Sequence, residues 1–162
     1  MKFKLEYLFF LIISIIAMTG CERDDICIDE ITPNLIIRFY DFEDQTETKS
    51  ISQLSIKING IENDSVFFSG TDSIFVPLKV TGNNTQFVFT VNSNDVALLN
   101  RDALTVNYSA EAVFVGRSCG YKSIFNNTTY DLTDDGNMWI QKIEMITEQI
   151  ENETTAHVKI FY

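Results

Sequence analysis

The sequence predicts an all-β protein whose strands pack as an antiparallel β-sandwich, and two observations carry this prediction. Short segments alternate apolar and polar residues with a period of two, as half-buried strands do. Polar turns separate these segments at intervals of about 8–14 residues, and no convincing helix stands between them to act as a crossover. Both observations indicate two packed sheets.

Eight segments are predicted strands, and a further one is of uncertain type. The strands are residues 35–40, 54–58, 74–80, 87–91, 104–116, 119–125, 139–150 and 156–162, and the uncertain segment is 96–99. Pro77 cannot donate a hydrogen bond to a neighbouring strand, so its strand should lie at a sheet edge. Ile140, Ile143 and Ile150 could also share a helix face, but their β-branched side chains favour extended structure. The last two strands should form a terminal hairpin.

Eight or nine short strands with frequent turns are typical of an immunoglobulin-like sandwich, which is the expected architecture. A small closed β-barrel is the alternative, because a period of two does not distinguish an open sandwich from a barrel. We place the sandwich domain at residues 33–162. By the usual relation between length and burial, such a chain forms one domain and buries about two-thirds of its unfolded surface.

Residues 1–20 have the features of a signal peptide. Lys2 and Lys4 precede an apolar run of eleven residues, Leu8–Met18. A membrane-spanning helix needs about 20 apolar residues. The run therefore fits the hydrophobic region of a signal peptide and is too short for a stable anchor. The mature chain is expected to begin at Cys21.

The end of this segment, Met18-Thr19-Gly20-Cys21, resembles the lipobox of bacterial lipoproteins. The resemblance implies that Cys21 is acylated and becomes the new N-terminus. Several acyl chains, at about 0.8 kcal/mol per buried CH₂, would hold the protein on a membrane. The alternative is a secreted protein that is cleaved nearby and keeps Cys21 as a structural thiol.

Residues 21–32 are expected to form an acidic tether. Glu22, Arg23, Asp24 and Asp25 resemble the charged export signal that follows the cysteine in lipoproteins of flavobacterial-type Gram-negative bacteria. The resemblance implies lipid attachment at the outer membrane, on its periplasmic or cell-surface face. The same residues also suit a solvated tether that is lengthened by self-repulsion.

The charge of the chain excludes some classes of partner. Twelve bases face 23 acids, a formal net charge of −11, and removal of residues 1–20 would leave about −12. A chain this acidic is not expected to bind nucleic acid or an anionic membrane surface.

Two of the three cysteines are expected to form a disulfide. With Cys21 committed to lipid, Cys27 and Cys119 make an even pair, and outside the cytoplasm such a pair is most simply bonded. The bond would close a loop of 93 residues, worth about 4–5 kcal/mol in the chain-entropy model. The alternative is two separate thiols, with Cys119 buried and Cys27 free near the tether.

Four segments carry a wider resemblance: residues 21–27 (CERDDIC), 32–41 (TPNLIIRFYD), 74–78 (IFVPL) and 118–121 (SCGY). Together they resemble an uncharacterised family of flavobacterial-type lipoproteins, which is known only as a domain of unknown function. The family supplies no activity and no catalytic residue. The resemblance therefore implies the localisation and leaves the role open.

The sequence offers few residues for catalysis, and we expect no enzyme, no cofactor and no metal. His157 is the only histidine and alternates with Val158, so it should be solvated or lie at an edge. A Cys119–His157 nucleophile pair is an alternative that a disulfide at Cys119 would remove. Residues 131–136 (DLTDDG) resemble the start of a calcium loop, but Lys142 stands where a glutamate is required, which favours a turn.

Two functions are expected to compete. The first is a tethered, non-catalytic module that binds another envelope protein or supports an outer-membrane assembly. The second is a glycan-binding module, in which exposed rings of Trp139, Tyr40 and Tyr121 would stack against the ligand. A core position for the only tryptophan is the alternative to that platform. A Cys-dependent enzyme comes third.

Overall fold

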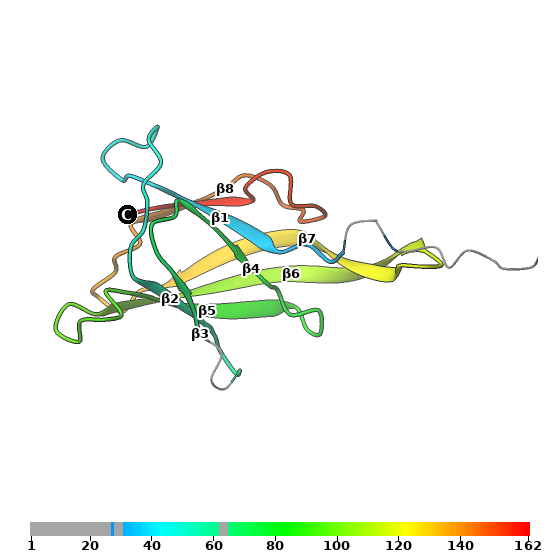
Figure 1. Cartoon of the computed structure of the whole chain (residues 1–162), viewed down its shortest axis with the longest axis horizontal. Helices are drawn as coiled ribbons and strands as arrows, with labels where there is room; N and C mark the ends of the chain where they lie inside the picture. Colours follow the sequence, from blue (N-terminus) through cyan, green and yellow to red (C-terminus); the bar gives the residue numbers. More distant parts are fainter. Residues whose placement is uncertain (1–26, 28–30, 62–64) are drawn as a thin grey trace, which may run out of the picture.

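The computed structural model describes residue 27, residues 31–61 and residues 65–162, and no helix occurs among them. The described chain forms nine strands in two sheets that face each other (Figure 1). One sheet has the order β4 (Ser73–Val76), β1 (Leu35–Tyr40), β9 (Val158–Phe161), β8 (Lys142–Met145). The other has the order β3 (Ser65–Phe68), β2 (Leu54–Ile58), β5 (Asn84–Val91), β6 (Asn100–Gly116), β7 (Gly120–Thr133). The predicted all-β sandwich is confirmed, and the sheets do not close into a barrel.

Most predicted strands are present, but several bounds differ. The strand predicted at 74–80 ends at Val76, before Pro77, and the strand predicted at 119–125 continues as β7 to Thr133. β3 has no predicted counterpart, because Ser65–Phe68 is four residues long and lacks apolar–polar alternation. The uncertain segment 96–99 forms turns. Within the predicted strand 139–150, the structure has β8 alone. The backbone N–H groups of Trp139 and Ile140 donate to the Asp102 carboxylate at 3.0 and 2.8 Å, so they do not join a strand ladder.

The strand pairs are antiparallel as predicted, apart from β1 and β9. These two run parallel, with Ile37 opposite Val158 and Phe39 opposite Ile160. Parallel neighbours need a long connection, and here the connection includes all the intervening strands. β8 and β9 pair antiparallel as predicted. β4, which Pro77 follows, is an edge strand as predicted.

The core lies between the sheets and is built from the inward face of each strand. In β1, Leu35, Ile37 and Phe39 are fully buried, whereas Arg38 is exposed. In β5 and β6 the same alternation buries the side chains of Phe87, Phe89, Leu104 and Val106. Full burial of one such side chain contributes about 1.5–3 kcal/mol. The period of two seen in the sequence therefore sets which face of each strand packs inward.

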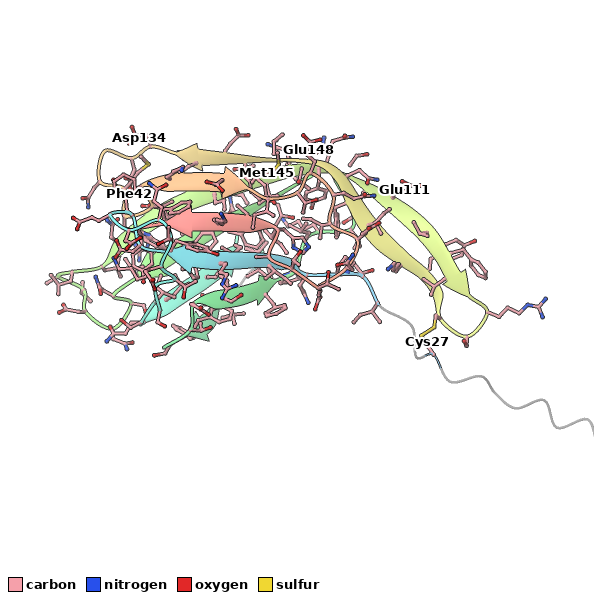
Figure 2. All side chains as sticks on the ribbon, turned by 90° about the horizontal axis from the view of Figure 1, so that it is seen from above. Cys27, Phe42, Glu111, Asp134, Met145 and Glu148 are labelled. Carbon is pink, nitrogen blue, oxygen red and sulfur yellow. A yellow bond between two sulfur atoms is a disulfide. The ribbon has the colours of Figure 1, made fainter. Side chains whose placement is uncertain are left out.

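β6 and β7 form a hairpin that extends past the other strands (Figure 1). Its register shifts between two pairs, Asn107–Thr129 and Ser109–Asn126, so that one residue of β6 faces two of β7. Asn127, one of these two, has a φ of 53°, in the left-handed region that asparagine tolerates better than most residues. A bulge of this kind bends the strands. The outer part of the hairpin curves away from the sandwich (Figure 2).

Several predictions concern residues that the structure does not describe. The signal peptide at residues 1–20, the acylated Cys21 and the export signal at residues 22–25 all lie outside the described residues. They stay predictions.

Candidate functional site

The disulfide lies at the outer end of the β6–β7 hairpin. Cys27 and Cys119 are bonded, with their sulfurs 2.01 Å apart, which confirms the predicted pair. Figure 2 shows Cys27 at the hairpin end, far from Phe42 and Asp134 at the other end of the molecule. Because its sulfur is bonded, Cys119 has no thiolate with which to attack a substrate.

His157 is buried, and the expectation of a solvated or edge histidine is wrong. Its side chain is 3% exposed. The Ile36 N–H donates to Nδ1 at 2.9 Å, so Nε2 carries the proton and donates to the Asn152 carbonyl at 3.0 Å. Burial lowers the pKa of His157, and the hydrogen bond to Asn152 opposes that shift. The ring is covered by the loop that precedes it, a long-range feature that local alternation does not encode.

The three aromatic residues of the predicted stacking platform lie in three separate contacts. The Tyr40 ring is half-buried, 5.5 Å from the Phe161 ring. The Trp139 ring is 5.6 Å from the Tyr162 ring and packs against the core. Tyr121 is 71% exposed at the hairpin tip. The structure does not bring the three rings together on one face.

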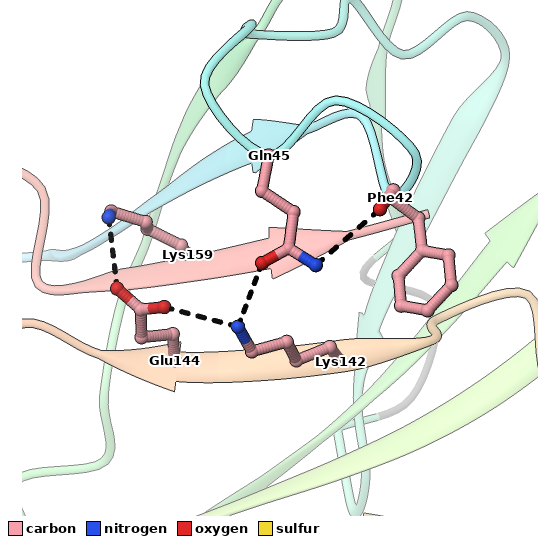
Figure 3. Close-up of polar contacts among 5 residues, drawn as sticks. All are labelled: Phe42, Gln45, Lys142, Glu144 and Lys159. Atoms are coloured by element: carbon pink, nitrogen blue, oxygen red, sulfur yellow. Dashed lines mark hydrogen bonds and ion pairs between the residues drawn. The ribbon is translucent and has the colours of Figure 1, made fainter.

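A polar network covers the outer face of β8 and β9 (Figure 3). Glu144 accepts hydrogen bonds from Lys159 at 2.9 Å and from Lys142 at 3.4 Å. Lys142 also donates to the side chain of Gln45 at 3.0 Å, and Gln45 donates to the Phe42 carbonyl. The hydrogen bond from Lys159 lowers the pKa of Glu144, and the one from Lys142 adds to the effect. The network fastens the loop after β1 to the sheet.

The acidic segment that resembles a calcium loop forms turns at the end of β7. Oδ1 of Asp134 accepts the Gly136 N–H at 2.8 Å, and Oδ1 of Asp135 accepts the Asn137 N–H at 2.9 Å. Such bonds are typical of Asx turns. In the described parts of the chain, no three His, Cys, Asp or Glu side chains are grouped to hold a metal ion.

The two sheets part on the side where β3 and β4 are the edge strands. An apolar pocket of about 90 Å³ opens between these strands. Around it, Val66 of β3 and Phe75 of β4 are 51% and 50% exposed, and Phe67 is 68% exposed. The pocket is lined by Ile56, Ile58, Val66, Phe68, Phe75, Val76, Pro77 and Phe87.

The opposite side of the sandwich is joined by main-chain hydrogen bonds. Phe125 of β7 and Ile150 exchange two of them, at 3.0 and 2.8 Å, and the Thr128 N–H donates to the Glu148 carbonyl at 2.9 Å. The two sides therefore differ. One is joined by hydrogen bonds between the sheets, and the other exposes apolar side chains on β3 and β4, each of which pairs with a single strand among the described residues. Exposed edges of this kind are where another chain can pair.

The alternation in the sequence does not reveal this open edge, because β3 has none. The signal available was the run Val66-Phe67-Phe68, which is apolar on both faces of a strand. A strand that is apolar on both faces is usually buried on both faces by other parts of the protein. In the structure, Val66 and Phe67 are exposed.

Three comparisons with known proteins give one match. A family model described as a family of unknown function (DUF6452) matches residues 55–162. No curated protein and no solved structure matches the chain. In the part of the chain that is described, no helix has the length and apolar character of a membrane span.

Proposed function

Because this chain belongs to that family of unknown function, we infer its role from its own residues and propose that it is an envelope lipoprotein. Acyl chains on Cys21 tether it to the outer membrane. It acts as a non-catalytic module that binds an extended segment of another envelope protein. The binding site is the open edge formed by β3 and β4.

The disulfide supports the proposed location. Cys27 and Cys119 are bonded, and structural disulfides persist in oxidising compartments outside the cytoplasm. The bond also attaches Cys27, which lies six positions after Cys21, to the end of the β6–β7 hairpin. A tether that is attached to the body of the protein in this way suits a protein held at a surface.

The open edge is the observation that carries the proposed binding role. Its pocket of about 90 Å³ is small beside the 300–1,000 Å³ that is common for small-molecule sites. It suits one apolar side chain of a partner strand that pairs with an exposed sheet edge, where main-chain hydrogen bonds give affinity and the pocket gives specificity. Val66 and Phe75, which line the pocket, supply exposed apolar surface around that anchor, and Phe67 adds exposed apolar surface on the other face of β3.

Cys119 and His157, the candidate nucleophile and base, both form structural bonds, which supports a non-catalytic role. The Cys119 sulfur is in the disulfide. Both ring nitrogens of His157 form hydrogen bonds with main-chain groups. A Cys-dependent enzyme would need a free thiolate beside an accessible base, and this pair offers neither.

Site-specific photo-crosslinking in intact cells tests the proposed site. A photoreactive residue at Phe67 is expected to form one discrete adduct with a second envelope protein. The adduct should weaken when Val66→Asp is added, because a carboxylate beside the pocket opposes burial of an apolar side chain.

Val96 provides the matched control, since it is 89% exposed and lies in the loop between β5 and β6. A photoreactive residue there should not give the adduct. The same adducts from both positions, or adducts with a second copy of this chain alone, would contradict the proposed partner.

A further inference from the structure

Three large apolar side chains are exposed at the hairpin tip, around the disulfide. Phe114 and Tyr121 face each other across β6 and β7, with ring centroids 5.3 Å apart. Ile31 and Tyr121 line one shallow hollow together with both cysteines. Their exposed fractions are 76% for Ile31, 57% for Phe114 and 71% for Tyr121. We call these three residues the tip cluster.

The disulfide and the short chain between Cys21 and Cys27 keep the tip cluster close to the proposed lipid anchor. Cys27 is bonded to Cys119 at the tip, and it follows Cys21 by six residues. Six residues reach at most about 20–22 Å when fully extended. Acyl chains on Cys21 would therefore hold the tip within about that distance of the membrane surface.

We propose that the tip cluster is a second membrane contact, which rests on the lipid surface beside the anchor. This inference depends on the proposed function, because it takes the acylated Cys21 as given. Aromatic rings sit favourably at the boundary between headgroups and acyl chains. The anchor makes this contact intramolecular, so a weak affinity of the tip for lipid suffices to hold it in place.

The contact is apolar in character, and electrostatic attraction adds little to it. Residues 112–130 contain two bases, Arg117 and Lys122, and no acid. The neighbouring tether, residues 21–30, carries five acids and one base, so its net negative charge exceeds those two positive charges. The contact should therefore form on zwitterionic lipid and change little with salt.

Contact of the tip with the lipid would also fix the distance between the membrane and the open edge. Phe87, which lines the pocket, pairs with Leu104 of β6, and β6 ends at Gly116 in the tip. The intervening strand spans roughly 30–40 Å at about 3.3 Å per residue. The open edge would then face a partner well above the lipid.

Depth-dependent fluorescence quenching on vesicles tests the tip cluster. The mature lipoprotein, purified from the envelope of a producing bacterium, is reconstituted into phosphatidylcholine vesicles whose acyl chains carry bromine. Phe114→Trp and Tyr121→Trp each add a reporter at the tip, and Val96→Trp adds an exposed reporter at the other end of the hairpin. Signal from Trp139 is subtracted by using the unmodified protein.

We expect bromolipid to quench the two tip reporters at least twofold more strongly than the Val96→Trp reporter, equally at low and high salt. Flotation of the protein with the vesicles, combined with equal quenching at both ends, would overturn the inference and leave the lipid tether standing. A blue shift of the tip emission without quenching, together with crosslinked dimers, would show that the tip is buried against a second copy of the chain. That result would also overturn the inference. Failure of the unmodified protein to float would overturn the tether and the inference together.

Discussion

At the scale of single residues, the buried His157 side chain connects two segments of the fold through hydrogen bonds. Its two hydrogen bonds join β1, through the Ile36 N–H, to the segment before β9, through the Asn152 carbonyl. The arrangement requires the neutral ring, because Nδ1 accepts a hydrogen bond and cannot do so when protonated. Burial disfavours the charged ring as well. Protonation should therefore loosen this junction.

The His157 junction predicts a pH dependence of stability. The folded protein holds the pKa of His157 below the usual 6.5, so the unfolded chain binds the proton more readily. This contribution is fully present above about pH 6.5 and is lost as pH falls below that value towards the folded pKa.

Urea unfolding at about pH 7.5 and pH 5.5 measures the effect, with His157→Gln as the control that cannot titrate. The drop in unfolding free energy between the two pH values should be smaller in His157→Gln than in the unmodified protein. Equal drops in both proteins would show that His157 does not titrate in this range.

The positions of some of these residues follow from the sequence, and those of others depend on tertiary contacts. Cys27 and Cys119 could be paired because an even number of cysteines outside the cytoplasm has one simple solution. The burial of His157 could not be found, because the loop that covers it is placed by tertiary contacts. Tyr40 and Trp139 were candidates for exposed platforms, but each packs against an aromatic residue close to the C-terminus.

At the scale of elements, the β6–β7 hairpin determines where the tip lies. The bulge at Tyr108, opposite Asn127 and Thr128, is one of two places where the register changes; the other lies between Phe114 and Gly116 at the tip. Tyr108 itself is buried, and its hydroxyl donates to the Lys79 carbonyl at 2.7 Å. The inner half of the hairpin is thus fixed to the sandwich, while the outer half carries the disulfide away from it.

Asn127 provides a test of that bulge. Asn127→Val forces a β-branched residue into the left-handed region, where an ordinary residue costs about 1–2 kcal/mol. Asn127→Gly keeps the conformation accessible. Urea unfolding should show a loss of about 1–2 kcal/mol for the valine variant and a much smaller change for the glycine variant. Two equal losses would mean that the side chain of Asn127, and not its backbone conformation, supports the bulge.

Elements with clear alternation could be predicted, and those without it could not. β1 and β2 occupy the predicted residues because one face of each strand is buried in the core. β3 was not predicted because its four residues show no alternation. β8 starts later than predicted because Asp102 accepts hydrogen bonds from the N–H groups of Trp139 and Ile140. It ends earlier than predicted, and Ile150 forms main-chain hydrogen bonds with Phe125 in the other sheet. The bulge at Asn127 depends on the pairing of two strands, which the period of either strand alone does not reveal.

At the scale of the whole molecule, the protein has two different ends and two different sides. The disulfide and the tip cluster occupy one end, and the loops that carry Phe42 and Asp134 occupy the other (Figure 2). Along the length, the β7–β8 side is joined through Phe125 and Ile150, whereas the β3–β4 side is open. This asymmetry separates the proposed lipid contact from the proposed binding edge.

The mass of the mature chain tests the lipid tether most directly. Intact mass spectrometry of the protein extracted from the bacterial envelope should find a chain that begins at Cys21 and carries acyl groups on that residue. Cys27 and Cys119 should be joined in the same molecule. A chain recovered without detergent, with an unmodified Cys21 thiol or an N-terminus elsewhere, would contradict the account.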